Sequence, residues 1–216
     1  MRKFLLVEDH GVVKECLRYT LVDSFPECAC DEAADAQEAM NKIWKNAYDL
    51  VLLDISLPGR SGLDVLKQIK KVKPELAVLI LTMYEEKMFG LRALRAGAAG
   101  YMTKKNTVSE LKTAIEQILQ GRKYISPSLA ELLISEFDEA GERPPHAELT
   151  DDELQVLTMI ASGRKTKEIA EDLALSVKTI NATRGRVLKK MKMNRSSRNS
   201  NSLYMNKLQG MGFHFS

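Results

Sequence analysis

The sequence predicts two domains of different fold class: an α/β domain with a five-stranded parallel sheet, doubly wound by helices, and then a small all-α helix-turn-helix domain. Three observations support this division. In the first half, short apolar runs of strand length alternate with longer segments of helical periodicity. The patterns of the second half are helical. Between the halves, residues 138–148 contain a Pro pair and no apolar periodicity, which is typical of a linker.

The alternating pattern extends over the first 121 residues. Strands are expected at residues 4–7, 50–53, 77–81 and 99–102, with a weaker candidate at 28–33. Helices are expected over residues 12–22, 36–45, 63–72, 87–96 and 108–120. Ser126 and Pro127 then resemble an N-cap followed by Pro at the first helical position, so a connecting helix is expected before the linker.

Composition excludes several classes of protein. The 216 residues are 44% hydrophobic and 28% charged, which is ordinary for a globular chain and not for a disordered or disulfide-scaffold protein. No apolar run approaches the roughly 18 residues of a membrane span, and Glu8 and Asp9 interrupt the N-terminal apolar run before it resembles a signal peptide. Cys16, Cys28 and Cys30 lack C-x-x-C spacing and are expected to be buried free thiols that bind no metal. A cytoplasmic location is therefore predicted.

Charge is divided unequally between the two halves. Residues 147–216 hold 12 Lys/Arg and 7 Asp/Glu, a net charge of +5, whereas residues 1–146 have a net charge of −2. After Asp172 every charged residue is basic. A surface of one sign is typical of a protein that binds a polyanion, although a solvated basic helix face gives the same pattern.

Chemically active residues follow four of the predicted strands. Glu8 and Asp9 follow the first strand, Asp54 the third, Thr82 the fourth and Lys104 the fifth. In a parallel sheet these carboxyl ends lie at one edge, where ligands of such folds bind. Crowded carboxylates favour a hard divalent cation such as Mg²⁺, and a carboxylate can attack phosphorus while cation, ammonium and hydroxyl neutralise the transferred group. The set indicates a phosphoryl-accepting site.

Two alternatives apply to these residues. Each one alone also fits a structural role, as a helix cap, a strand-end hydroxyl or a solvated loop charge. A Mg²⁺-dependent phosphohydrolase would also place a nucleophilic Asp after a strand, but such enzymes usually need a second acid two residues later, where this chain has Ser56. The joint occurrence of the right residue types at four strand ends favours the phosphoryl-accepting site, and no metabolic enzyme activity is expected.

Residues 1–121 resemble the receiver domain of bacterial two-component response regulators, which has a flavodoxin-like fold. By this resemblance a partner sensor histidine kinase phosphorylates Asp54, and Lys104 pairs with the phosphoryl group. The resemblance rests on four motifs, Val7-Glu8-Asp9-His10, Leu53-Asp54-Ile55-Ser56-Leu57-Pro58-Gly59, Leu81-Thr82-Met83 and Gly100-Tyr101-Met102-Thr103-Lys104.

The same resemblance implies a metal site and a conformational switch. Glu8 and Asp9 would hold Mg²⁺ together with Asp54 and the backbone carbonyl of Ser56. Thr82 and Tyr101 would form the switch pair, in which the hydroxyl moves toward the phosphate and the aromatic ring follows inward.

Met83, directly after Thr82, is larger than the small residue that many receivers have there. A bulky side chain at this place could obstruct the water that hydrolyses an acyl phosphate. We therefore predict slow autodephosphorylation.

The second half begins with a strong helix-start signal. Thr150 and Glu153 have capping-box spacing, and the helix is expected to continue toward Gly163. A second helix is expected over residues 166–173, and Ser176 is a suitable N-cap for a third. The result is a helix-turn-helix.

The third helix is predicted to be apolar on one face, with Val177, Ile180, Val187, Leu188 and Met191, and polar or basic on the other. Such a helix suits the major groove, where Asn181 can bind adenine and basic side chains neutralise phosphates. A three-helix interaction domain with a solvated basic face is the alternative. The candidate DNA contacts are Lys178, Thr179, Asn181, Ala182, Gly185, Arg186, Lys189, Lys190 and Lys192.

Residues 147–216 resemble the LuxR-type helix-turn-helix domain, so that with residues 122–146 as connecting helix and linker the chain is similar to a NarL/FixJ-class response regulator. Departures are Asn181 and Thr183, where relatives often have Lys and His, Gly185, and the polar stretch 198–202 where the family has an apolar dimerisation face. The motifs are Leu149-Thr150-Asp151-Asp152-Glu153, Val156-Leu157, Ala161-Ser162-Gly163, Lys167-Glu168-Ile169-Ala170, Leu175-Ser176-Val177-Lys178-Thr179-Ile180 and Leu188-Lys189-Lys190-Met191.

The sequence thus predicts a response regulator in which phosphorylation of Asp54 controls binding to double-stranded promoter DNA and hence transcription. RNA polymerase and a second copy on DNA are the further partners that this function implies. The alternative, motivated by Asn181, Gly185 and the polar tail, is an atypical regulator that acts by protein contact or independently of phosphorylation.

Overall fold

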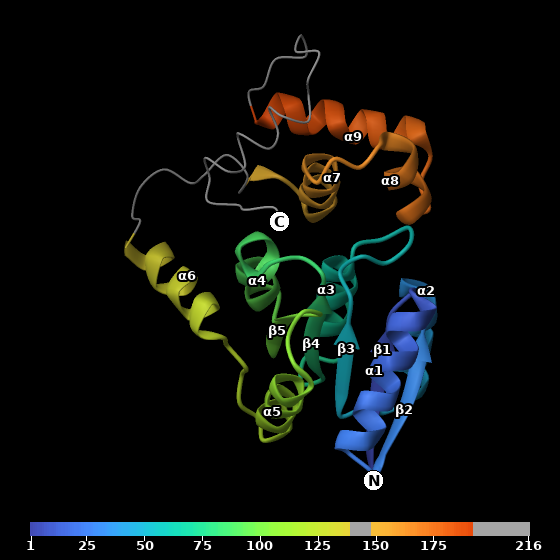
Figure 1. The fold of residues 1–216 in the computed structure, drawn as a ribbon, viewed down its shortest axis with the longest axis vertical. Helices are drawn as coiled ribbons and strands as arrows, with labels where there is room; N and C mark the ends of the chain where they lie inside the picture. The colour runs from blue at the N-terminus through green and yellow to red at the C-terminus, as the bar shows by residue number, and fades with distance from the viewer. Residues whose placement is uncertain (139–147, 192–216) are drawn as a thin grey trace. The chain divides into compact units, whose positions relative to one another are not determined.

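The structure, a computed structural model, describes residues 1–138 and 148–191 (Figure 1). The chain divides into two compact units, residues 1–137 and residues 138–216. The first unit is α/β and the second is helical in its described part, so the predicted fold class is confirmed.

The first unit alternates strands with helices, and the bounds of its five strands and of α1 to α5 differ from the predicted ones by at most two residues. The elements are β1 (Arg2–Val7), α1 (Gly11–Ser24), β2 (Cys28–Ala33), α2 (Ala36–Lys45), β3 (Leu50–Leu53), α3 (Gly62–Val72), β4 (Ala77–Thr82), α4 (Glu86–Arg95), β5 (Gly100–Thr103), α5 (Val108–Leu119) and α6 (Pro127–Asp138).

The five strands form one parallel sheet in the order β2-β1-β3-β4-β5. Strand order reverses at β1, so the carboxyl ends of β1 and β3 lie side by side at the switch point. Helices α1 and α5 pack together over one face of the sheet, and α2, α3 and α4 are neighbours over the other, which is the doubly wound arrangement (Figure 1). Because helices cover both faces, the inner strands β3 and β4 are apolar without alternation, and all four residues of β3 are buried.

Local signals determine where several of these helices begin. The Asp35 carboxylate accepts the Glu38 amide at 2.8 Å at the start of α2, and the Ser61 hydroxyl caps α3. Thr107 and Glu110 form a capping box at α5. These caps fix the helix starts directly after the loops that follow the strands, which is where the candidate site lies.

Helix α6 packs on α4 within the first unit. Leu129 is fully buried against Gly90 of α4. A Cβ atom added to Gly90 would lie 2.7 Å from Cδ1 of Leu129. The Ser126 hydroxyl donates to the Glu86 carboxylate at 2.7 Å, and the Arg95 guanidinium pairs with Glu136. The connecting helix is therefore held by apolar and polar contacts to α4.

The described part of the second unit has three helices, α7 (Asp151–Ala161), α8 (Thr166–Asp172) and α9 (Val177–Lys190). The capping box of Thr150 and Glu153 starts α7, and the Ser176 hydroxyl accepts the Thr179 amide at 3.0 Å at the start of α9. This is the predicted helix-turn-helix. Within residues 1–138 and 148–191, no helix is long and apolar enough to cross a membrane.

The buried face of α9 differs from the predicted one. Ile180, Val187 and Met191 are buried as expected, but Val177 is 40% exposed and Leu188 is half-buried. Thr183 takes a core position instead, because it lies between Ile180 and Val187 in the row of residues three and four apart that faces α7 and α8. Val177 is the first residue of the helix and lies at the turn, beyond that row.

The expectation that the cysteines are buried is wrong for Cys16, which is exposed, while Cys28 and Cys30 are half-buried. The polar stretch 198–202 and residues 139–147 of the predicted linker lie outside the described residues.

Candidate functional site

Lys104 joins two of the strand-end carboxylates. Its ammonium donates to Asp54 Oδ2 at 2.6 Å and also to Glu8 Oε2. These residues come from the carboxyl ends of β5, β3 and β1, and they are 50 and 96 positions apart in the sequence. The parallel sheet thus brings three predicted site residues into direct contact.

The cluster of Glu8, Asp54 and Lys104 is almost inaccessible to solvent. Glu8 is 1% and Asp54 3% exposed, and the Lys104 side chain is almost fully buried. Burial alone would lower the pKa of Lys104, but the carboxylates of Asp54 and Glu8 outweigh it and hold that pKa above its ordinary value. The lysine therefore keeps a positive charge next to Asp54.

Asp9 and His10 lie next to Glu8, and the three residues form a cluster of potential metal ligands. The potential ligand atoms of Glu8, Asp9 and His10 lie within 4.8 Å of one another. Asp9 Oδ1 is buried and has no hydrogen-bond partner among the described residues, although His10 Nδ1 lies 2.9 Å away. Carboxylate oxygens, among them a buried one that accepts no hydrogen bond from the described residues, suit a hard cation such as Mg²⁺. The sequence analysis did not assign His10 to this group.

Asp54 is oriented by its own loop. Its Oδ1 atom accepts the backbone N–H of Ser56 at 3.2 Å, and its Oδ2 atom accepts from Lys104. The backbone N–H of Asp54 donates to the carbonyl of Val7 at 3.1 Å, which ties the end of β3 to the end of β1. The carboxylate is thus held between β1 and β5.

Thr82 and Tyr101 lie on the adjacent strands β4 and β5. The Thr82 hydroxyl is fully buried and has no hydrogen-bond partner among the described residues. The Tyr101 ring is also fully buried, and its hydroxyl donates to the carbonyl of Tyr84 at 2.8 Å. Burial, with smaller contributions from Asp54 and Glu86, raises the pKa of Tyr101 well above its ordinary value. In this structure the ring is already inward, while the hydroxyl of Thr82 is left to accept or donate a bond.

Gly62 is a positioning residue that the sequence analysis did not identify. A Cβ atom at this position would lie 2.0 Å from the backbone carbonyl oxygen of Asp54, so only glycine lets the first turn of α3 approach the end of β3 this closely. The signal available in the sequence was the pair of glycines in the loop after Asp54, Gly59 and Gly62. Gly59 has a φ of +74°, which explains the first of them.

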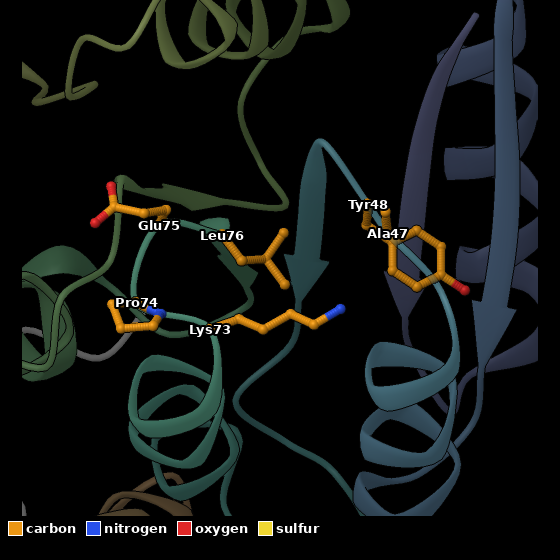
Figure 2. Close-up of a pocket in the computed structure, with 6 residues that line it drawn as sticks. All are labelled: Ala47, Tyr48, Lys73, Pro74, Glu75 and Leu76. Atoms are coloured by element: carbon orange, nitrogen blue, oxygen red, sulfur yellow. The ribbon is translucent and has the colours of Figure 1, made fainter.

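A pocket of about 390 Å³ lies at the opposite edge of the sheet, between the loops that precede β3 and β4. Figure 2 shows the Lys73 side chain extending across it toward the loop of Ala47 and Tyr48. Lys73 Nζ donates to the carbonyl of Asn46 at 2.7 Å, which links the two loops. None of the predicted site residues lines this pocket, whose remaining lining residues are Pro74, Glu75 and Leu76.

In the second unit, α9 exposes most of the predicted DNA contacts. The buried residues Ile180, Thr183 and Val187 face α7 and α8, and Gly185 is half-buried. Lys192 lies outside the described residues. The exposed candidates form the outer surface of α9: Lys178, Thr179, Asn181, Ala182, Arg186 and Lys189.

Two of the predicted phosphate contacts, which are partly exposed, pair with a buried glutamate of α7. Lys190 Nζ donates to Glu153 Oε2 at 2.6 Å, and Arg186 Nε donates to Glu153 Oε1 at 3.3 Å. Glu153 is the capping-box residue of α7. Sequence periodicity placed these cations on the helix surface but gave no sign of a buried partner from another helix.

Comparison with known families accounts for both units. Residues 4–116 match the family described as response regulator receiver domain, and residues 147–198 match the bacterial regulatory proteins of the luxR family.

Relatives match most of the chain. The response regulator UvrY of Escherichia coli K12 is 34% identical over 192 residues, which cover 88% of each chain. The response regulator GacA of Pseudomonas aeruginosa is 33% identical over 192 residues, covering 88% of this chain and 90% of GacA. The oxygen regulatory protein NreC of Staphylococcus carnosus is 33% identical over 200 residues, covering 88% and 91%.

Solved structures show the same folds. A LuxR-family two-component response regulator from Aurantimonas matches with a TM-score of 0.58 and 38% identity, over 63% of this chain and 98% of that one. RcsB of Salmonella enterica serovar Typhimurium, bound to the promoter rprA in the presence of the phosphomimetic BeF₃⁻, matches with a TM-score of 0.63 and 24% identity, over 96% and 98% of the two chains.

Proposed function

The chain belongs to the NarL/FixJ-class response regulators, with a receiver domain and a LuxR-type helix-turn-helix domain, and from this premise we propose that a sensor histidine kinase phosphorylates Asp54 to control promoter binding. The observation that carries the proposal is the contact of Lys104 with both Asp54 and Glu8 at the carboxyl edge of the sheet. A buried carboxylate next to a charged ammonium can accept a phosphoryl group whose negative charge the ammonium then neutralises.

The proposed reaction is a phosphoryl transfer. A carboxylate oxygen of Asp54 attacks the phosphorus of a phosphohistidine on the kinase, the P–N bond breaks, and the electron pair returns to the imidazole. Lys104, released from its contact with Asp54, pairs with an oxygen of the new acyl phosphate. The unpaired Thr82 hydroxyl supplies a hydrogen bond to another of its oxygens, and the Tyr101 ring is buried on the strand beside it.

The acidic residues would hold Mg²⁺. Glu8, Asp9 and Asp54, with the backbone carbonyl of Ser56, supply the hard oxygen donors that this ion prefers. When bound, Mg²⁺ would neutralise charge on the phosphoryl oxygens and on the carboxylates. The buried Oδ1 atom of Asp9, which accepts no hydrogen bond from the described residues, supports this assignment.

The output would be DNA binding through α9. Lys178 and Lys189 would contact phosphates, Asn181 would bind a base, and Thr179, Ala182 and Gly185 would lie at the groove surface. RcsB, which shares this fold, is bound to promoter DNA in two solved structures, and this supports DNA binding as the output. Phosphorylation would shift the population toward the arrangement in which α9 is accessible, and binding by two copies and contact with RNA polymerase would follow on the promoter.

Selection of genomic DNA fragments by the purified full-length protein tests this function. The selection is run at fixed salt with Mg²⁺, with and without acetyl phosphate, for the wild type, for Asp54→Ala and for the control Asp64→Ala, which removes a half-exposed carboxylate on α3. Acid-stable and acid-labile phosphate are measured in parallel, because an acyl phosphate is hydrolysed readily.

We expect donor-dependent enrichment of discrete fragments by the wild type and by Asp64→Ala, with one labile phosphate per chain, and neither result for Asp54→Ala. Enrichment that is independent of donor and of Asp54 would contradict phosphorylation control and favour the atypical regulator. Absence of any enrichment would favour action by protein contact.

A further inference from the structure

Glu153 is a buried glutamate that connects two helices of the output domain. Its side chain is only 4% exposed. It accepts the backbone N–H of Thr150 at 3.0 Å and the Lys190 ammonium at 2.6 Å through Oε2, and the Arg186 guanidinium at 3.3 Å through Oε1. The residue therefore caps α7 and at the same time pairs with two cations of α9.

The two cations have further partners within the protein. Lys190 Nζ also donates to the carbonyl of Glu148 at 3.1 Å, and Arg186 Nη2 donates to the Thr183 hydroxyl at 2.9 Å. Two of the three ammonium protons of Lys190 are thus committed at the start of α7. Lys189, its neighbour in the sequence, is exposed on the outer surface of α9.

A buried glutamate needs such partners. Burial works to raise the pKa of Glu153, but Lys190, the Thr150 amide and Arg186 outweigh it and hold the pKa below its ordinary value. Removing a cation would leave a buried carboxylate short of its partners, which is far more costly than losing an exposed ion pair. The contact of Glu153 with Lys190 therefore connects the start of α7 to the last turn of α9.

We propose that Lys190, through Glu153, is a positioning residue that fixes the orientation of α9 on α7 and does not contact DNA phosphates. The inference rests on the proposed DNA binding by α9. Base contacts depend on the angle at which a helix enters the groove, whereas the affinity for phosphates depends mainly on the charges displayed. Loss of the connection should therefore reduce binding to the specific site and leave nonspecific binding unchanged.

The adjacent lysines provide a matched test. Lys190→Met and Lys189→Met are made in the full-length chain, and binding is measured after acetyl phosphate treatment as a function of salt. The probes are one duplex recovered by the genomic selection and a scrambled duplex of the same composition. The slope of log affinity against log salt counts the phosphates neutralised, at about 0.9 per contact.

For Lys189→Met we expect a slope smaller by about 0.9 on both duplexes and an unchanged Tm. For Lys190→Met we expect unchanged slopes, an affinity for the selected duplex reduced about tenfold, and an unchanged affinity for the scrambled duplex. A smaller slope for Lys190→Met, or an equal loss on both duplexes, overturns the proposal.

Glu153→Gln tests the connection from its other end. Glutamine keeps the capping-box contact to Thr150 but removes the charge that pairs with Lys190. We expect the same selective loss of specific affinity, no further loss in the double variant Glu153→Gln/Lys190→Met, and near wild-type behaviour for Lys190→Arg. Additive losses in the double variant would contradict a shared connection.

These outcomes also distinguish a failure of the positioning role of Lys190 from a failure of the proposed DNA binding by α9. A wild type without salt-dependent DNA binding contradicts the proposed function, and with it the role of Lys190 in binding. If the wild type binds and Lys189→Met reduces the slope, but Lys190→Met does the same, the proposed function stands and only the positioning role fails. Helix content, measured by circular dichroism, shows whether each variant is folded.

Discussion

Gly62 determines, at the scale of a single residue, how closely the loop after β3 lies against Asp54. We predict that Gly62→Ala lowers the free energy of unfolding of the receiver by about 2 kcal/mol, because the added methyl group overlaps the Asp54 carbonyl and the backbone must shift. Uptake of phosphate from acetyl phosphate should slow, since Asp54 moves with that backbone. Urea unfolding and phosphate incorporation measure the two effects.

Gly11→Ala is the control for this substitution, because a Cβ atom at Gly11 would meet nothing within 4 Å. It should leave stability nearly unchanged. Equal stability and equal phosphate uptake in Gly62→Ala would show that the contact with Asp54 has no functional importance.

Met83 is predicted to lengthen the lifetime of the phosphorylated form. Its side chain is 57% exposed directly after the buried Thr82, so it can shield the acyl phosphate from water. We predict that Met83→Ala shortens the half-life of the phospho-form about fivefold, which corresponds to about 1 kcal/mol in activation free energy. The decay of labelled phosphoprotein measures this half-life. Met83→Leu, which keeps the bulk, should behave as the wild type, and an unchanged half-life in Met83→Ala would remove the support for shielding.

At the scale of elements, the turn between α8 and α9 contains a residue in an unfavourable conformation. Ala174 has a φ of +50°, the left-handed region that costs a residue with a Cβ atom about 1–2 kcal/mol. We predict that Ala174→Gly stabilises the output domain by about 0.5 kcal/mol, because relief of this cost exceeds the added chain entropy of glycine. Thermal unfolding is the measurement. Ala182→Gly, in the exposed surface of α9, should instead destabilise by about 1 kcal/mol, and the same sign for both variants would contradict the interpretation.

Helix α6 depends on one buried side chain. Leu129 fills the space that Gly90 leaves on α4. We predict that Leu129→Ala removes about 3 kcal/mol of packing free energy between α6 and α4. Helix α6 should then separate from α4 while the sheet remains folded. Hydrogen exchange of the amides of residues 130–138 should then accelerate, and that of the strands should not. Ile134→Ala, at an exposed position of the same helix, is the control, and unchanged protection of α6 in Leu129→Ala would show that the polar contacts of Glu86 suffice.

At the scale of the whole molecule, the two compact units should unfold separately. Each has its own core, one between sheet and helices and the other among α7, α8 and α9. We predict two calorimetric transitions. Ile80→Ala, in the middle of β4, should lower the midpoint temperature of one transition by several degrees, and Ile180→Ala, in α9, should lower the midpoint temperature of the other. A single transition that shifts equally in both variants would show that the two units unfold as one.

The order and type of the elements could be predicted from the sequence alone, because hydrophobic periodicity and helix caps are local signals. It also predicted that Glu8, Asp54 and Lys104 lie together, because the carboxyl ends of parallel strands share one edge of a sheet. Gly62 could not be found in this way, since the carbonyl that it approaches is eight residues away and its closeness depends on the path of the loop.

Which cations of α9 are free to contact DNA depends on how the helices pack, and this could not be predicted from the sequence. Lys189 and Lys190 are indistinguishable by type and nearly so by position in the sequence. The packing of α9 against α7 turns one of them toward the buried carboxylate of Glu153 and leaves the other on the surface. The physical reason is that the partner of a buried charge is set by the crossing of two helices, and residues 37 positions apart carry no local signal of that contact.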